Sequence, residues 1–180
     1  MNTTVAFDRI ASPLGPMVLA SDGIALTGAW FDGQRHQPPV GPDWQRRSDL
    51  PVLRRAAVAL AEYFAGERTG FDLPLSPAGT PFQRAVWSAI AEVRYGETMT
   101  YGELAAHAGR PRAVRAAGAA TGRNPLSIVV PCHRIVGANA GLTGYAGGLA
   151  RKRSLLALER GAAAAAAAPR MARERVAAPA

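Results

Sequence analysis

Short apolar segments separated by turns occupy the first part of the chain. Residues 5–31 hold three mostly apolar segments, and the turns between them contain Pro or Gly at residues 12–16 and 21–23. Apolar segments of this length bounded by Pro and Gly are typical of strands, so we predict a β-meander. Residues 33–49 are polar and rich in proline, which predicts a loop.

A helical period follows the meander. Apolar side chains recur at every fourth position from Val52 to Phe64, which places them on one face of a helix. We therefore predict a helix over residues 51–64, ended by the glycine that follows. Residues 71–79 contain two prolines and predict a linker, with the domain boundary between residues 76 and 77.

Two helix-start signals mark the second part of the chain. Thr80 and Thr100 are each followed three residues later by Gln or Glu, which is the spacing of a capping box. We predict a helix from residue 81 that ends at Gly96, and a second helix over residues 101–107. A third helix over residues 112–122 follows a tight turn, and this layout is that of a helix-turn-helix, although plain helical hairpins share it.

The third predicted helix carries almost no large side chains except Arg115. Alanine-rich faces usually pack closely against another helix. In a basic context they also permit close approach to nucleic acid, where Arg115 could contact phosphate or enter the duplex.

The remaining segments are a glycine-rich stretch, a helix and a tail. Residues 137–148 predict a flexible loop, and residues 149–160 predict a last helix with Leu155, Leu156 and Leu158 as its apolar positions. Residues 161–180 are rich in alanine and predict a poorly ordered tail. The expected fold class is α/β (α+β), with a small N-terminal β-meander/α domain at 1–76 and a mostly helical C-terminal domain at 77–160.

Positive charge is concentrated in the second part of the chain. The 180 residues carry a formal net charge of +8, and residues 101–160 hold nine Lys and Arg against only Glu103 and Glu159. A basic segment of this kind is typical of a protein that binds a polyanion such as nucleic acid. A general bias toward Arg would explain part of the excess, but it would not remove the acidic residues from the same segment.

The composition also limits compartment and cofactor. No segment approaches the ~20 apolar residues of a membrane span, and residues 1–8 lack the pattern of a signal peptide. With a single cysteine, these features predict the cytoplasm, where thiols stay reduced. Three histidines and one cysteine are too few for a zinc-type ligand cluster, so we predict no metal site.

Cys132 is that single cysteine, and it lies between an apolar segment and His133-Arg134. A lone thiol cannot form an internal disulfide. One interpretation is a small buried apolar residue. The other is a nucleophile, because a neighbouring histidine or cation favours the thiolate form.

The residues around the thiol match a family pattern. Pro131-Cys132-His133-Arg134 is preceded by Asn124-Pro125 and followed by Tyr145-Ala146-Gly147-Gly148, and residues 101–105 and 115–118 fall at matching spacings. This pattern resembles the O6-alkylguanine-DNA alkyltransferases, also called methylated-DNA–protein-cysteine methyltransferases. The likeness runs from about residue 80 to residue 159 and extends loosely to the N-terminal meander.

The resemblance implies a fold and a reaction. The N-terminal domain would be ribonuclease H-like, and the C-terminal domain would carry a winged-helix-like helix-turn-helix. The protein would bind double-stranded DNA containing O6-alkylguanine, flip the damaged base out, and transfer the alkyl group irreversibly to Cys132. No cofactor, metal or membrane is implied, the protein would act as a monomer, and activity on O4-alkylthymine is left open.

The resemblance also assigns roles at the thiol. His133 would act as a base toward Cys132 through a water, and Glu159 would orient His133, as in a nucleophile–base–orienter triad. Asn124 would support the thiol. Tyr101 would hydrogen-bond the flipped base and help the leaving guanine gain a proton.

Further residues are implied at the DNA surface and the substrate pocket. Arg115 would fill the gap left in the base stack, and the other implied DNA contacts are Tyr101, Ala116, Gly118, Thr121 and Arg123. The implied pocket residues are Ile135, Tyr145, Ala146 and Lys152. The backbone carbonyls of Cys132 and Ile135 would accept from the guanine amino group, and Ala146 stands where some relatives have serine.

Three other classes of protein are alternatives to an alkyltransferase. A lesion-binding relative of the family without transferase activity would lack the thiol. A cysteine hydrolase would use Cys132 and His133, but such enzymes usually bring the histidine from a distant part of the chain. A transcriptional regulator would use the helix-turn-helix and leave the thiol unexplained.

Overall fold

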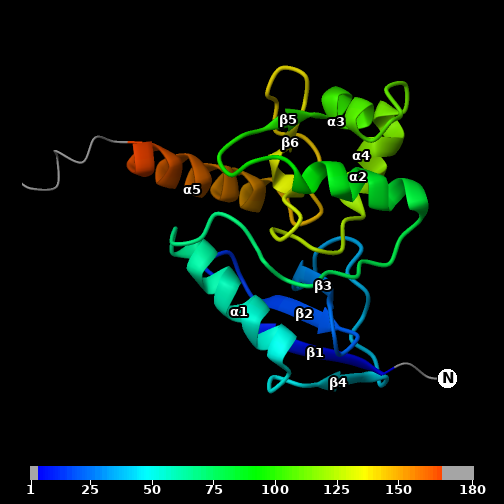
Figure 1. Ribbon diagram of the computed structural model, residues 1–180, viewed down its shortest axis with the longest axis vertical. Helices are drawn as coiled ribbons and strands as arrows, with labels where there is room; N and C mark the ends of the chain where they lie inside the picture. Colours follow the sequence, from blue (N-terminus) through cyan, green and yellow to red (C-terminus); the bar gives the residue numbers. More distant parts are fainter. Residues whose placement is uncertain (1–3, 168–180) are drawn as a thin grey trace, which may run out of the picture.

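The computed structural model describes residues 4–167, and its N-terminal part is a small sheet covered by one helix (Figure 1). The first three strands are β1 (Val5–Ile10), β2 (Met17–Ser21) and β3 (Leu26–Phe31), and each pairs antiparallel with the next. The predicted meander is therefore confirmed. β2 is buried along its whole length because it lies between two neighbours in the sheet.

One strand lies where the polar pattern predicted only a loop. β4 (Trp44–Arg46) pairs in parallel with the start of β1 and extends the sheet order to β3-β2-β1-β4. Three residues are too few to show a periodic pattern, and their partner strand lies about forty positions earlier in the sequence. The aromatic rings of Phe7 and Trp44 meet edge to face at 5.7 Å and help to hold the pair together.

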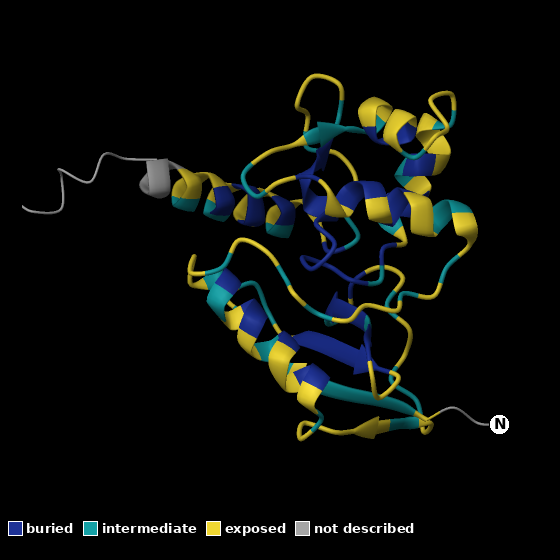
Figure 2. Cartoon of the chain, viewed as in Figure 1, coloured by how far each residue is buried: buried dark blue, intermediate teal, exposed yellow. Residues whose placement is uncertain are grey.

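Helix α1 (Pro51–Phe64) covers one face of this sheet (Figures 1 and 2). It begins at Pro51, which suits the first helical position because proline has no amide hydrogen to leave unpaired. Its buried stripe includes Val52, Ala56 and Leu60, as the four-residue spacing predicted, whereas Phe64 is only partly buried. Tyr63 is also fully buried, and its hydroxyl contacts Glu159 in the second part of the chain.

The C-terminal part is mostly helical. α2 (Pro81–Ala91) and α3 (Tyr101–His107) both begin with complete capping boxes, so these two helix starts are confirmed. β5 (Met99–Thr100) directly precedes α3, and α4 (Val114–Gly122) completes the helix-turn-helix. α2 ends five residues before the predicted stop at Gly96, because the chain there turns to bring the Gly96 amide to Glu159.

The chain then passes the short 3-10 helix η1 (Cys132–Arg134), β6 (Ile135–Val136) and α5 (Leu149–Ala167). β6 pairs in parallel with β5. The tail was predicted to be poorly ordered from residue 161, and this was wrong for residues 161–167, which continue α5. Alanine has the highest intrinsic helix propensity, so an alanine run extends a helix that packing has already begun. The rest of the predicted tail, residues 168–180, lies outside the described residues.

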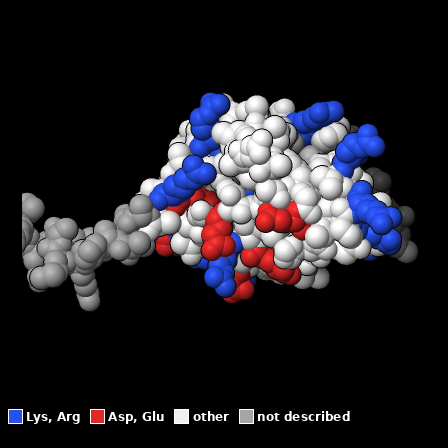
Figure 3. Space-filling model, turned by 90° about the horizontal axis from the view of Figure 1, so that it is seen from above, with Lys and Arg blue, Asp and Glu red and all other residues white. Residues whose placement is uncertain are grey.

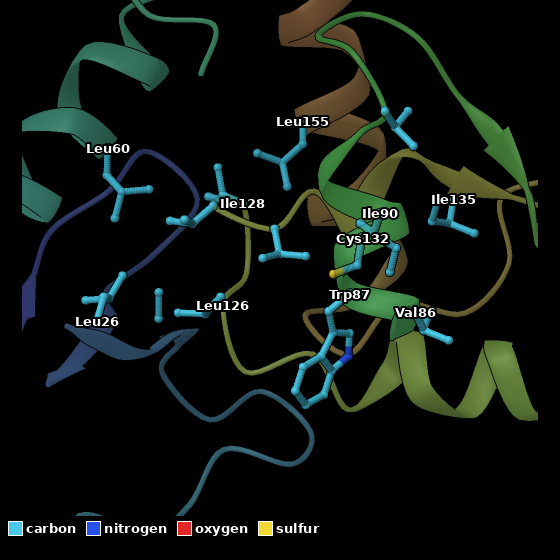
Figure 4. Packing of buried hydrophobic residues seen from close by; sticks show 14 of the residues in the cluster. Leu26, Leu60, Val86, Trp87, Ile90, Leu126, Ile128, Cys132, Ile135 and Leu155 are labelled. Carbon is cyan, nitrogen blue, oxygen red and sulfur yellow. The ribbon is translucent and has the colours of Figure 1, made fainter. Parts of the chain in front are cut away.

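The two parts share one continuous apolar core. Leu26 and Leu60 of the N-terminal part belong to the same buried cluster as Leu126 and Ile128, which precede the thiol (Figure 4). Backbone hydrogen bonds from Ala29 to Pro125 and from Ser127 to Ala29 join the edge of the sheet to the segment before the thiol. The N-terminal part therefore packs directly against the segment that leads to Cys132. None of the helices in the described part of the chain is long and apolar enough to cross a membrane.

Candidate active site

Cys132 occupies the first position of η1 and is only 3% exposed. It belongs to the buried cluster that contains Trp87 and Ile90 of α2 (Figure 4). Ile128, four residues before the thiol, has φ 72°, a left-handed backbone conformation that a β-branched residue rarely adopts. Strain of this kind persists only where the surroundings hold it, and here it shapes the turn that delivers the thiol.

Asn124 provides that restraint. Its side-chain amide nitrogen donates to the Val130 carbonyl at 2.8 Å and lies 3.1 Å from the Cys132 sulfur. Its side-chain oxygen accepts from the backbone amide of Leu126 at 3.0 Å. One buried amide therefore holds the turn and donates to the thiol, as expected from the resemblance.

The protonation state of the thiol differs from the expectation. Burial raises the pKa of Cys132, although the hydrogen bond from Asn124 and the charge of Lys152 act in the opposite direction. A neighbouring histidine and cation were expected to favour the thiolate, but burial has the larger effect. Cys132 therefore rests as a thiol at neutral pH and needs a base to become a nucleophile.

His133 and Glu159 form a fully buried pair. Nε2 of His133 lies 2.7 Å from Oε1 of Glu159, and both side chains are 0% exposed. Burial lowers the pKa of His133, while the hydrogen bond to Glu159 opposes this shift. Because a carboxylate accepts the Nε2 hydrogen, Nδ1 is left as the acceptor. Nδ1 is buried and has no hydrogen-bond partner within residues 4–167.

Arg134 was expected to favour the thiolate form of Cys132 as a neighbouring cation. Its guanidinium instead contacts Glu159. Its guanidinium makes two contacts with Glu159 at 2.9 Å and also donates to the Val93 carbonyl at 2.6 Å. Burial alone would raise the pKa of Glu159, but the hydrogen bonds from His133 and Arg134 lower it to about 2. Glu159 is therefore a carboxylate throughout the neutral range.

Sequence reasoning missed Tyr63 as part of this cluster. Its hydroxyl donates to Oε1 of Glu159 at 2.7 Å, across 96 positions of sequence. A tyrosine on the apolar stripe of a helix is typical of a core residue, so no local signal identifies it. The backbone amide of Gly96 completes the cluster by donating to Oε2 of Glu159 at 3.1 Å.

A pocket of about 300 Å³ opens between α3, α4 and the glycine-rich loop. Five of the predicted substrate or DNA residues line it, namely Tyr101, Gly118, Arg123, Tyr145 and Ala146. Sequence reasoning missed two other lining residues, Arg35 and His36, which the N-terminal part contributes. The backbone amide of Arg35 donates to the Ala146 carbonyl at 3.1 Å, which brings this loop to the pocket.

The thiol lies close to two hydroxyls of this pocket. Burial raises the pKa of Tyr101, and the charge that Cys132 can carry raises it further. The same two causes raise the pKa of Tyr145 well above its ordinary value. Both hydroxyls therefore stay protonated and can donate a hydrogen bond to a base held in the pocket.

Lys152 lies beneath the glycine-rich loop and is fully buried. Its Nζ donates to the carbonyls of Ile135 and Thr143, and the Tyr101 hydroxyl donates to the carbonyls of Thr143 and Gly144 at 3.3 and 3.2 Å. The glycine-rich loop was expected to be flexible, but Lys152 joins it to β6 and Tyr101 joins it to α3. Burial lowers the pKa of Lys152 to about 8.

The two backbone carbonyls expected to read the base are both occupied. The Cys132 carbonyl accepts from the Ile135 amide, and the Ile135 carbonyl accepts from Lys152. A carbonyl oxygen has two lone pairs, so each keeps one acceptor position. Ile135 itself is fully buried, so only its backbone could face a ligand.

Helix α4 and its C-cap carry five of the six predicted DNA residues, of which three are exposed. Arg115, Ala116 and Arg123 are exposed, whereas Thr121 is buried and its hydroxyl donates to the Ala117 carbonyl at 2.8 Å. The prediction that Thr121 faces DNA was therefore wrong, because Thr121 lies on the buried side of α4 and its hydroxyl bonds within its own helix. Trp87 of α2 holds that side by donating to the Ala120 carbonyl.

Figure 3 views the molecule from the end that carries β5, β6 and α3 in Figure 1. Lys and Arg side chains flank an uncharged area in the upper part of this view, and Asp and Glu lie in its middle and lower part. Such a surface can accept a polyanion over the uncharged area with basic side chains at its edges. Within residues 4–167 no three His, Cys, Asp or Glu side chains come together as a metal-binding group.

Two family models match the chain. The model described as 6-O-methylguanine DNA methyltransferase, DNA binding domain, covers residues 81–161. The model described as 6-O-methylguanine DNA methyltransferase, ribonuclease-like domain, covers residues 6–77.

Similar proteins and structures carry related names. The methylated-DNA–protein-cysteine methyltransferase of Haemophilus influenzae is 45% identical over 159 residues, which is 88% of each chain. That of Methanosarcina acetivorans is 48% identical over 148 residues, covering 82% of this chain and 94% of the relative. The crystal structure of Mycobacterium tuberculosis OGT in complex with DNA superposes with a TM-score of 0.82 at 44% identity, covering 87% of this chain and 94% of the other.

Proposed function

The chain belongs to the O6-methylguanine DNA methyltransferase family, and we propose that it repairs duplex DNA by transferring the alkyl group of O6-alkylguanine to Cys132. The observation that carries this proposal is the arrangement around the thiol. The Cys132 sulfur lies 3.1 Å from the Asn124 amide, and the adjacent His133 is paired with Glu159 at 2.7 Å. A buried nucleophile, a base and an orienting carboxylate suit displacement at an alkyl carbon.

Proton transfer comes first, because burial keeps Cys132 as a thiol. With Nε2 of His133 bound to Glu159, Nδ1 can take the thiol proton through one bridging water. The sulfur lone pair then forms the bond to the alkyl carbon while the bond from that carbon to O6 breaks. The electron pair of the broken bond stays with the guanine, which gains a proton through the Tyr101 hydroxyl. Because burial keeps this hydroxyl protonated, it regains a proton as it gives one, and the proton taken from Cys132 leaves His133 to solvent.

The product is a thioether on Cys132 and an unmodified guanine. A carbon–sulfur thioether bond has no good leaving group, and a His–Glu pair does not hydrolyse it. Each protein molecule therefore reacts once. The alkylated base supplies the group that is transferred, so the reaction calls for no organic cofactor.

The DNA must present an extrahelical base, because the thiol is buried and only 3% exposed, so a base stacked in a duplex could not reach it. The helix-turn-helix of α3 and α4 would bind the duplex with the exposed small side chain of Ala116 close to the backbone. Arg115 would occupy the space that the flipped base leaves. Arg123 and Gly118 line the pocket mouth and would meet the flanking nucleotide.

The chain divides into two functional parts in this proposal. Residues 1–76 would form the ribonuclease-like domain and residues 77–160 the alkyl-acceptor domain, which the ranges of the two family models support. The compartment would be the cytoplasm, because the reaction needs Cys132 to remain reduced.

The experiment that tests the proposal is an intact-mass measurement after incubation with a duplex containing one O6-methylguanine. The mass of the wild-type protein should rise by one methylene in proportion to the lesion supplied, and peptide mapping should place the gain on Cys132. Cys132→Ala and an undamaged duplex should show no gain. Selective binding to the damaged duplex without any mass gain would contradict alkyl transfer and favour a lesion-binding role.

A further inference from the structure

Tyr63 brings the N-terminal domain into the proton-transfer cluster. It lies near the end of α1, and its side chain is fully buried. Its hydroxyl donates to Oε1 of Glu159 at 2.7 Å and lies 3.5 Å from Nε2 of His133. The remaining side chains of the cluster belong to the C-terminal domain, so this hydroxyl is a direct polar link between α1 and the active site.

The Glu159 carboxylate is held by donors on both oxygens. Oε1 accepts from Tyr63, His133 and Arg134, and Oε2 accepts from the Gly96 amide and Arg134. Tyr63 and His133 therefore share one oxygen. Each donor to that oxygen withdraws charge from it and weakens its attraction for a proton held by the others.

We propose that Tyr63 is a positioning residue for alkyl transfer: its hydroxyl holds Oε1 of Glu159 against Nε2 of His133 and limits the basicity of the imidazole. This inference rests on the proposed function of Cys132 and His133. In the resting protein His133 must be neutral, with Nδ1 free to accept the thiol proton. A fully available carboxylate would instead favour the doubly protonated imidazolium, which cannot take that proton.

The other charged groups around His133 and Glu159 also shift the pKa of His133. Arg134 of η1 and Lys152 of α5 lower the pKa of His133 through their positive charges, and Glu159 raises it. Tyr95 lies on the segment after α2, with its ring 6.0 Å from that of Tyr63. Burial raises the pKa of Tyr63 far above neutrality, so its hydroxyl remains a donor at every working pH.

Removing the Tyr63 hydroxyl should shift the proton equilibrium of His133. In Tyr63→Phe, Oε1 keeps the donors His133 and Arg134, so no buried oxygen is left without a partner. The carboxylate gains effective charge at Nε2, and the pKa of His133 should rise by roughly half a unit or more. The acidic limb of the pH–rate profile for alkyl transfer should move upward by the same amount.

The experiment compares single-turnover alkyl transfer between pH 5 and 9 in wild type and Tyr63→Phe, with nitrogen NMR titration of His133 in parallel. We expect a loss of about threefold or more on the acidic side and rates within about twofold at alkaline pH. Tyr95→Phe is the matched control. It removes the same atom from the neighbouring ring, and within residues 4–167 the Tyr95 hydroxyl has no hydrogen-bond partner.

The outcomes separate this inference from the proposed function. Superimposable profiles for wild type and Tyr63→Phe, or an equal shift in Tyr95→Phe, would overturn the positioning role. So would a loss that is uniform across pH with an unchanged His133 titration, because that pattern marks a purely structural residue. A wild-type protein that transfers no alkyl group would refute the proposed function, and the His133 titration would still decide whether Tyr63 controls the imidazole.

Discussion

At the scale of single residues, the environment of Cys132 combines an apolar wall with one polar donor. Burial in the cluster around Trp87 and Ile90 raises the pKa of the thiol, and the Asn124 amide at 3.1 Å lowers it. The reactive thiolate therefore forms only when a base accepts the proton and a donor stabilises the charge that remains on sulfur. Asn124 is the side chain that donates to the sulfur, so it should control the energy of the thiolate.

Asn124→Ala tests this role. Loss of a hydrogen bond to a charged group costs about 1.5–3 kcal/mol, so alkyl transfer should slow by about tenfold or more and the pKa of Cys132 should rise. The rate of Cys132 with a small thiol reagent, measured against pH, reports that pKa directly.

A matched control separates chemistry from folding. Gln34→Ala removes another buried amide, whose oxygen accepts from the Phe31 amide and the Ser127 hydroxyl. It should lower the melting temperature as Asn124→Ala does and leave the pKa of Cys132 near its wild-type value. Equal thiol pKa values in Asn124→Ala and wild type would contradict the role assigned to Asn124.

At the scale of elements, α4 has two faces with different composition. Its buried face packs Ala117 and Ala120 against the core, while Ala116 and Ala119 are exposed beside Arg115. Small exposed side chains leave the helix backbone accessible, which explains why this helix can approach a duplex closely. A longer acidic side chain on this face should block that approach by both volume and charge.

Ala116→Glu is the test of the α4 surface. We expect its affinity for a damaged duplex to fall by about tenfold or more, because a carboxylate would face the phosphates. The melting temperature should stay close to that of wild type, since position 116 is exposed. Fluorescence anisotropy at several salt concentrations measures the affinity, and Ala61→Glu on the exposed side of α1 is the control. Equal losses in the two variants would argue against α4 as the DNA-binding surface.

At the scale of the whole molecule, the buried cluster links folding to pH. Unfolded Glu159 takes up a proton near pH 4.5, whereas the folded carboxylate does so only near pH 2. Between these values the unfolded chain binds more protons, so stability falls as the pH falls. His133 acts in the same direction from about pH 6.5 downward, because burial lowers its pKa in the folded protein.

Urea unfolding at pH 7, 5 and 3 should therefore show a progressive loss of stability. The contribution of Glu159 is on the order of 3 kcal/mol and should disappear between pH 4.5 and pH 2. Glu159→Gln should be less stable at pH 7 and should depend less on pH. Glu92→Gln, which changes an exposed carboxylate at the end of α2, should retain the wild-type dependence. An unchanged dependence in Glu159→Gln would exclude this carboxylate as the source.

Local signals in the sequence determined the elements and the reactive residue. The capping boxes at Thr80 and Thr100 located two helix starts, and the four-residue period located α1. These signals work because caps and helical faces involve residues within about four positions of each other. The Pro-Cys-His-Arg segment marked Cys132 as a candidate nucleophile, and the resemblance to a family pattern assigned its role.

Tertiary structure alone decided how distant residues meet. The pairing of β4 with β1, the inward orientation of Thr121, and the turn of Arg134 from the thiol to Glu159 depend on packing and not on local spacing. The contact between Tyr63 and Glu159 spans 96 positions and joins two domains. A periodic pattern reports which side of a helix is buried, but the partner atom on that side depends on the angle and distance at which whole elements pack.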